Sequence, residues 1–241
     1  MEKIYTIPVN EAFDHTDACP FCRMKRDLDE KEVDLILGAS MMEPDVRIQT
    51  NAKGFCGEHY EAMWRAQKRL PLALILESHL EEIRKACRTP RLSIKEKTGV
   101  VAHHAESFAD GCYICDRVEF HLAHMFETAC LLWESDGAFR KKFAAQDHFC
   151  LPCYVRLLKT AMRFLAKKTL PEFLDAAQTV EQKYLDNLKS DVSQFCRKFD
   201  YRYQKEPWGT ARDAVERAIR FLSGEGILAE DTKKSSDTDD V

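Results

Sequence analysis

Apolar residues recur every three or four positions along most of the chain, which is the period of an α-helix with one buried face. The clearest run occupies the middle of the chain, with apolar positions at Ile114, Val118, Leu122, Met125, Ala129 and Leu132. The Asp136-Gly137 pair that follows predicts a turn. The sequence contains no convincing hairpin pattern and no strand–helix–strand pattern, so it predicts an all-α fold.

Other helices are predicted from the positions of Gly and Pro as well as from the spacing of apolar residues. An earlier amphipathic run ends at Gly38 and has its apolar face at Phe21, Met24, Leu28 and Leu35. Pro71 and Pro171 suit the first turn of new helices, where the missing N–H costs nothing. The run over residues 173–199 is long enough for about seven helical turns. A last helix is predicted after Pro207-Trp208-Gly209.

The chemistry of the chain lies in four pairs of Cys or His residues, each with two residues between its members. The pairs are Cys19-x2-Cys22, Cys56-x2-His59, Cys112-x2-Cys115 and Cys150-x2-Cys153. Between the first and second pairs lie 33 residues, and between the third and fourth lie 34. Phe precedes and Tyr follows both the second and the fourth pair. The sequence therefore predicts a duplication with two ligand pairs in each copy.

The duplication predicts the domain organisation. Residues 1–88 would form a first metal-site helical repeat, and residues 89–104, with Pro90 and Gly99, a linker. Residues 105–228 would form a second metal-site repeat that includes the long helix and the C-terminal helix. Residues 229–241 are polar and rich in Ser and Asp, which predicts a disordered acidic tail.

Two Cys-x2-Cys or Cys-x2-His pairs supply the four donors of a tetrahedral zinc site. Pairing within each copy predicts one site with three Cys and one His donor, made of Cys19, Cys22, Cys56 and His59. The other predicted site has four Cys donors, which are Cys112, Cys115, Cys150 and Cys153. Each pair would open a helix, where free N–H groups and the helix dipole stabilise thiolate. Two zinc ions are predicted, with an iron–sulfur cluster as the alternative.

The remaining candidate groups are weaker. His121, His124 and His148 lie close to the second predicted site and could serve a second metal or proton transfer, although exposed or capping histidines are commoner. A thioredoxin-like role for Cys-x2-Cys would require a strand–helix–strand setting that the sequence does not offer. The other three cysteines lie on or beside apolar helical faces and are predicted to be core residues: Cys87, Cys130 and Cys196.

Composition narrows the class of protein. The chain has 241 residues and a formal net charge of −4, which argues against a general nucleic-acid binder. Its longest apolar stretch, residues 70–76, is too short to cross a bilayer, and no signal-peptide pattern opens the sequence. These observations predict a soluble cytoplasmic protein without a membrane partner. Ten cysteines in such a chain indicate metal or redox chemistry rather than a disulfide framework.

Several short motifs resemble those of an uncharacterised bacterial family of the domain-of-unknown-function kind. They are residues 4–13, Cys19-Pro20-Phe21-Cys22, Gly54-Phe55-Cys56, Gly111-Cys112-Tyr113-Ile114-Cys115, Phe149-Cys150-Leu151-Pro152, Asp200-Tyr201-Arg202 and Pro207-Trp208-Gly209. The family pattern has Phe-Cys-x2-His at the last pair, where this chain has Cys153 in place of His. The replacement keeps four donors and makes a zinc-loaded site one charge more negative. The resemblance implies a bacterial cytoplasmic origin and no assigned reaction.

Two main functional hypotheses follow. The first is a metal-stabilised helical scaffold that binds a protein or small-molecule partner through its helical surface or through the segment around Trp208. The second is a metal-dependent or iron–sulfur redox enzyme. The sequence carries no catalytic motif, so no catalytic residue is assigned and enzymatic activity stays open. A zinc-ribbon-like nucleic-acid binder ranks last, because neither the charge nor the long helices fit it.

Overall fold

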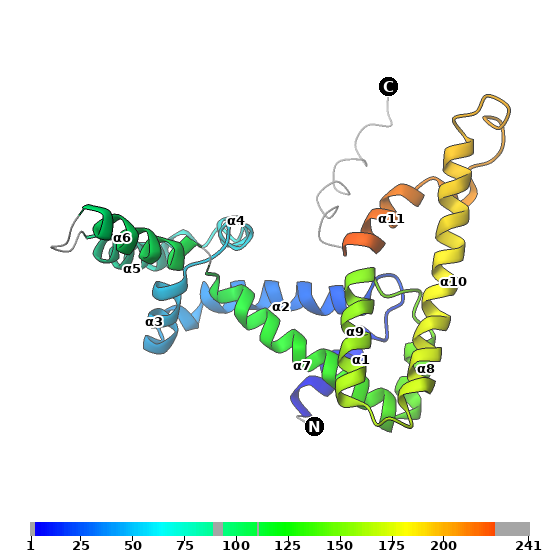
Figure 1. Cartoon of the computed structure of the whole chain (residues 1–241), viewed down its shortest axis with the longest axis horizontal. Helices are drawn as coiled ribbons and strands as arrows, with labels where there is room; N and C mark the ends of the chain where they lie inside the picture. The colour runs from blue at the N-terminus through cyan, green and yellow to red at the C-terminus, as the bar shows by residue number, and fades with distance from the viewer. Residues whose placement is uncertain (1–2, 89–93, 110, 225–241) are drawn as a thin grey trace. The chain divides into compact units, whose positions relative to one another are not determined.

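The computed structural model describes residues 3–88, 94–109 and 111–224 (Figure 1). Every regular element in those ranges is helical, which confirms the predicted all-α fold. In chain order the elements are η1 (Lys3–Tyr5), α1 (Thr6–Ala12), α2 (Pro20–Ile36), η2 (Ala39–Met42), α3 (Pro44–Lys53), α4 (Gly57–Arg65), α5 (Arg69–Ala86), α6 (Ile94–Ala109), α7 (Tyr113–Ser135), α8 (Gly137–Ala144), α9 (Leu151–Phe164), α10 (Leu170–Arg197), η3 (Gly209–Ala211) and α11 (Ala214–Ser223). No helix in these ranges combines the length and apolar character needed to cross a membrane.

The chain divides into two compact units. The first consists of Met1–Lys25 and Leu122–Val241, and the second of Arg26–His121. Both boundaries fall inside helices, one in α2 and one in α7. This division differs from the two predicted repeats, and most of the predicted linker belongs to helix α6. Residues 89–93 and the predicted tail 229–241 lie outside the described residues.

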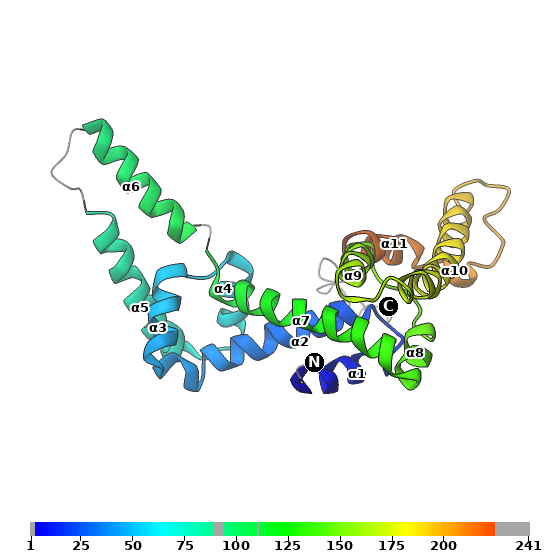
Figure 2. The ribbon, with the colours of Figure 1, turned by 60° about the horizontal axis from the view of Figure 1, so that its bottom comes forward.

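The first unit is built around aromatic side chains. Its fully buried phenylalanines are Phe13, Phe21, Phe126, Phe139, Phe143, Phe149 and Phe173. Phe21 and Phe126 stack face to face with 3.8 Å between ring centroids, and Trp133 meets Phe173 edge to face at 5.0 Å. Helix α10 packs against α8, α9 and α11 around this core (Figure 2). The apolar face predicted between residues 114 and 132 is buried at every named position.

Helix α10 is the long helix that the apolar period predicts, and it has 28 residues. It is followed by a buried lysine, Lys198, whose ammonium group donates hydrogen bonds to the backbone carbonyls of Tyr203 at 3.0 Å and Gln204 at 2.7 Å. These bonds close the loop that leads back towards α11. Trp208 packs on Phe195 with 5.6 Å between ring centroids, so its main contact within the chain anchors this loop.

The second unit contains helices α3 to α6. Helix α3 packs against α5, and α5 packs against α6 (Figure 2). Leu72 and Ile75 of α5 and Met63 of α4 supply buried apolar side chains. His79 is also buried, and its Nδ1 donates a hydrogen bond to the carbonyl of Asn51 at 2.8 Å. The backbone of α3 therefore supplies a hydrogen-bond acceptor for the buried ring of His79.

Three predicted core positions are wrong. Leu35 is 39% exposed, because near the end of α2 the buried positions are Val33 and Ile36 instead. Cys87 and Cys196 are exposed as well. Cys87 directly follows the last residue of α5 and Cys196 lies in the final turn of α10, where neighbouring elements cover less of a helix. The third cysteine of that group, Cys130, is fully buried as predicted.

Candidate metal centres

All four ligand pairs occupy the same place in a helix. The first residue of each pair directly precedes the helix, and the second is the third helical residue; the helices are α2, α4, α7 and α9. In each case the N–H four residues after the first donor bonds to its carbonyl, at 3.1, 2.9, 3.1 and 2.8 Å in chain order. Donors three residues apart in a first turn lie on one side of the helix. The prediction that each pair opens a helix is confirmed.

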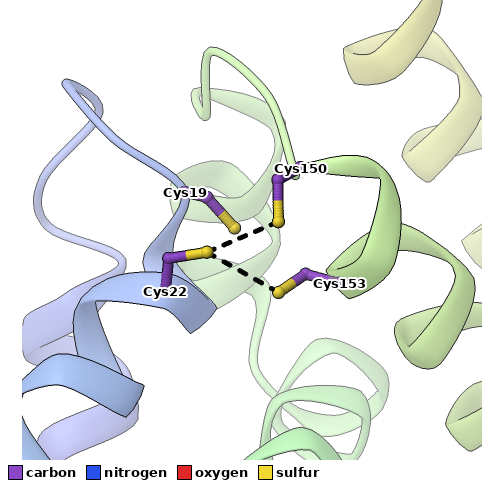
Figure 3. Close-up of side chains that lie close together, drawn as sticks. All are labelled: Cys19, Cys22, Cys150 and Cys153. Atoms are coloured by element: carbon purple, nitrogen blue, oxygen red, sulfur yellow. Dashed lines mark hydrogen bonds between the residues drawn. The ribbon is translucent and has the colours of Figure 1, made fainter. Parts of the chain in front are cut away.

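In the first unit, four cysteines from the starts of α2 and α9 converge (Figure 3). They are Cys19, Cys22, Cys150 and Cys153, and their sulfur atoms all lie within 4.8 Å of one another. The Sγ of Cys22 is 3.4 Å from that of Cys150 and 3.9 Å from that of Cys153. Cys19 and Cys150 are completely buried. We call this group the four-Cys cluster.

The four-Cys cluster is supported from several elements. Phe21, between the two donors of α2, is the ring that stacks on Phe126. On the α9 side, the backbone N–H of Phe149 donates to Oε2 of the buried Glu181 at 3.2 Å. Gly224, at the end of α11, has φ +88°, and a Cβ there would lie 3.8 Å from the sulfur of Cys22. Backbone at this glycine therefore approaches the sulfur atoms closely.

Burial and contacts between sulfur atoms raise the pKa of two thiols of the four-Cys cluster in the absence of metal. Loss of solvent, together with hydrogen bonds to the neighbouring thiols, raises the pKa of Cys19 well above its usual value. The hydrogen bond with Cys150 raises the pKa of Cys153 as well. These thiols keep their protons at neutral pH until a cation replaces them.

In the second unit, three cysteines and a histidine converge from the starts of α4 and α7. They are Cys56, His59, Cys112 and Cys115, again with all donor atoms within 4.8 Å of one another. Nδ1 of His59 lies 3.1 Å from the sulfur of Cys56, 3.3 Å from that of Cys112 and 3.4 Å from that of Cys115. One ring nitrogen therefore faces all three sulfur atoms. We call this group the three-Cys cluster.

The other ring nitrogen of His59 faces a carboxylate. Its Nε2 lies 3.2 Å from Oδ1 of Asp29, a residue of α2. A metal-binding histidine commonly donates its second N–H to such a carboxylate, which fixes the tautomer and the orientation of the ring. Asp29 is not among the site residues that the sequence predicts. It lies 30 residues before His59 within a strongly charged stretch, so its spacing carries no recognisable signal.

The same contacts set the protonation of the three-Cys cluster without metal. Burial lowers the pKa of His59, but hydrogen bonds to Asp29, Cys112 and Cys56 outweigh it and raise the pKa to about 10. Burial raises the pKa of Cys112, whereas its hydrogen bond with His59 and backbone N–H groups lower it to about 6. A proton on Nδ1 then lies where a cation would otherwise meet the three sulfur atoms. Metal and proton compete for one position.

Backbone contacts hold the two halves of the three-Cys cluster together. The N–H of Tyr113 donates to the carbonyl of Gly54 at 3.0 Å. Gly54 has φ +66°, a conformation that favours glycine. A Cβ on Gly111 would lie 2.5 Å from the carbonyl oxygen of Lys53. Glycine at residue 111 therefore permits the close approach of the two segments that carry the ligand pairs.

The predicted pairing of the ligand pairs is wrong. The predicted donor types are nevertheless found, since one cluster has four Cys and the other has three Cys and one His. The prediction joined Cys19 and Cys22 with Cys56 and His59, whereas the structure joins them with Cys150 and Cys153. Helix α2 starts at the first pair and is about 25 Å long at 1.5 Å per residue. The second pair follows this helix in the sequence and meets the third pair instead.

The donor types and their spacing are compatible with metal binding. Zinc binds thiolate sulfur at about 2.3 Å, so the four donors of one tetrahedral site lie roughly 4 Å apart. Both clusters meet this requirement with protein donors alone. The same donor types also hold iron–sulfur clusters. All ten cysteines are free of disulfide bonds.

The three candidate histidines lie outside both clusters. His148 is buried and stacks on Tyr184 with 4.1 Å between ring centroids. His124 stacks on Tyr5 at 5.4 Å, and Nε2 of His121 lies 3.9 Å from a carboxylate oxygen of Glu32. None of them joins a group of metal-ligating side chains in the described part of the chain.

In the described residues, fold and clusters together define a helical protein with paired Cys and His residues of metal-ligand type at four helix N-termini. The chain belongs to the family described as "Family of unknown function (DUF6062)", which matches residues 1–228. This confirms the resemblance to a domain-of-unknown-function family. A search of curated proteins and a search of solved structures found no match.

Proposed function

We propose that this protein is a zinc-binding helical scaffold in which two structural zinc ions each join two helix N-termini. The observation that carries the proposal is the convergence of eight donors into two groups of four, each within 4.8 Å. Structural zinc sites use four protein donors, whereas catalytic sites keep one position for water or substrate. Zinc would exchange for the protons of the thiols and of His59, and so cross-link the helix starts.

Sequence separation supports a role for the metal in folding. Cys22 and Cys150 of the four-Cys cluster are 128 residues apart, and His59 and Cys112 of the three-Cys cluster are 53 apart. Bringing such distant residues together costs chain entropy that increases with loop length. Metal binding to sites that are absent in the unfolded chain contributes its free energy directly to folding.

A scaffold held in this way would present its helical surfaces to a protein or small-molecule partner. Because four protein donors would complete the coordination of each zinc ion, a partner would be recognised by side chains outside the clusters. The exposed aromatic groups beyond α10 are one such surface, since Phe199 and Tyr201 are both largely exposed. We therefore assign no catalytic role to either cluster.

The proposal is tested by elemental analysis and an absorbance spectrum of untagged protein purified without oxygen. We expect about two zinc ions per chain, as two four-donor sites require, and no visible absorption band. The double variant Cys150→Ser/Cys153→Ser should hold about one zinc ion. Iron with sulfide and a visible band would overturn the proposal in favour of a redox enzyme. A metal content near zero in protein that keeps its helical fold would overturn it as well.

A further inference from the structure

A cleft of about 490 Å³ lies between helices α7 and α9 of the first unit. Its lining residues are Ala123, His124, Glu127, Arg156, Lys159, Thr160, Arg163 and Phe164. Three of them are Arg or Lys and one is Glu, so the formal charge of this lining is positive in a chain whose formal net charge is −4. This cleft is separate from the eight metal-ligating residues.

The cations of the cleft follow one face of α9. Arg156, Lys159 and Arg163 are spaced by three and four residues, which aligns them on a helix. The guanidinium carbon of Arg156 lies 4.7 Å from the ring centroid of Phe126, and that of Arg163 lies 5.3 Å from the centroid of Phe164. Such ring contacts restrict both guanidinium groups before a ligand arrives, which lowers the entropy cost of binding.

Groups opposite the cations come from α7. His124 is stacked on Tyr5, which fixes the plane of its ring. Its Nδ1 lies 3.6 Å from a carboxylate oxygen of Glu127, which is the one acidic side chain among the described residues that line the cleft. A carboxylate beside cations accepts hydrogen bonds from hydroxyl groups, as acidic residues do with ribose. Ala123 and Phe164 add apolar surface.

The chemistry of the lining selects one class of ligand. Arginine binds phosphate through two parallel hydrogen bonds, and lysine adds a compact positive charge. The volume lies in the range of sites for small organic ligands and exceeds the need of a single inorganic anion. We propose that the α7–α9 cleft binds a small hydroxylated organic phosphate, with the phosphate on the α9 cations and a hydroxyl group on Glu127. The proposal goes beyond the scaffold role and does not depend on the identity of the metal.

The test is a calorimetric titration of the full-length, metal-loaded chain with adenosine 5′-monophosphate and with glucose 6-phosphate. Adenosine, glucose and inorganic phosphate serve as reference ligands. We expect saturable binding of at least one of the two phosphate esters. We also expect that ester to bind more tightly than its phosphate-free counterpart and more tightly than inorganic phosphate.

A matched pair of variants locates the binding. Lys159→Gln/Arg163→Gln removes two exposed cations of the cleft, and Lys183→Gln/Lys189→Gln removes two exposed cations of α10. Because hydrogen bonds between charged groups are lost only in the first variant, its affinity should fall by about tenfold or more. The α10 variant should stay within about twofold of the unmodified chain, since distant exposed charges are screened. Circular dichroism checks that both variants keep their helix content.

Three outcomes would overturn the proposal. The first is equal affinity in the two double variants, which would place any binding elsewhere. The second is the absence of saturable binding of both phosphate esters up to millimolar concentration. The third is tight binding of a single-stranded RNA oligomer that the cleft variant loses, without binding of either ester, because the cleft would then serve a polymer.

Discussion

Asp29 gives the three-Cys cluster a partner outside the ligand set. A carboxylate that accepts from Nε2 leaves Nδ1 as the nitrogen that faces the three sulfur atoms. It also increases the electron density that the ring offers to a cation. The four-Cys cluster, with no histidine donor, has no place for such a contact. A substitution at Asp29 should therefore affect metal binding at the three-Cys cluster and not at the four-Cys cluster.

Replacing Asp29 with alanine should weaken zinc binding at the three-Cys cluster by about 10- to 100-fold. Asp34→Ala is the matched control, because Asp34 lies on the same helix and pairs with Lys68 at 3.0 Å on the surface. Competition with a zinc chelator measures the affinity of both variants. Equal losses in the two variants would show that general charge, and not the contact with His59, is responsible.

Glu181 provides a test of the surroundings of the four-Cys cluster. This side chain is only 4% exposed, and its Oε1 has no hydrogen-bond partner among the described residues. Burial raises the pKa of Glu181 to about 7 from its usual 4.5, although the N–H of Phe149 offsets part of the effect. The folded state therefore favours the neutral acid. Its stabilising effect is complete below pH 4.5 and is lost as the pH rises through about 7.

Glu181→Gln should consequently stabilise the protein relative to the unmodified chain as the pH rises from about 5 to 8. Glutamine stays neutral and keeps an oxygen that can accept from the N–H of Phe149. The gain should reach at most about 3 kcal/mol, since one pKa unit corresponds to 1.36 kcal/mol. Urea unfolding of both metal-loaded proteins at each pH measures the difference. A difference that does not change with pH would contradict the raised pKa.

Periodicity predicts where helices lie better than it predicts which neighbouring elements cover them. The pattern from Ile114 to Leu132 identifies the buried face of α7 correctly, because other elements cover that face along its length. Leu35 and Cys196 fit a similar pattern near helix ends and are exposed. The period shows which side chains share a face. The period does not show how far along the helix a neighbouring element extends.

Gly111 lies in the segment before α7. Gly111→Ala should destabilise the second unit by about 1–3 kcal/mol, because the added Cβ meets the backbone of Lys53, which cannot move aside as a side chain would. Gly57→Ala is the control within a ligand pair, since a Cβ there meets nothing within 4 Å. Its stability should change by less than about 0.5 kcal/mol. Thermal unfolding of the metal-loaded variants distinguishes the two.

Each cluster belongs to one compact unit. The four-Cys cluster uses residues of the first unit only, and the three-Cys cluster uses residues of the second unit only. We therefore expect the clusters to bind metal independently. Cys112→Ser/Cys115→Ser should release one metal ion and leave the affinity of the four-Cys cluster within about twofold. Loss of both ions from this variant would show that the clusters depend on each other.

The sequence predicts the donors and their helix positions, but it does not predict which pairs meet. Cys-x2-Cys spacing is local, because one helical turn determines whether two donors point the same way. The partner of the pair at Cys19 and Cys22 depends instead on where the chain returns after α2 and α7. Separations of 33 and 34 residues favour pairing within each copy, yet helix length and packing decide otherwise.

The observed pairing of the ligand pairs determines the order in which the two clusters can be completed during translation. The three-Cys cluster is complete in sequence once Cys115 has left the ribosome, whereas the four-Cys cluster must wait for Cys153. The two early thiols, Cys19 and Cys22, therefore remain without their partners while more than a hundred further residues are translated. During translation, the three-Cys cluster can therefore assemble before the four-Cys cluster. A cell that is short of metal during translation would leave the N-terminal thiols exposed longest to oxidation or to a wrong ion.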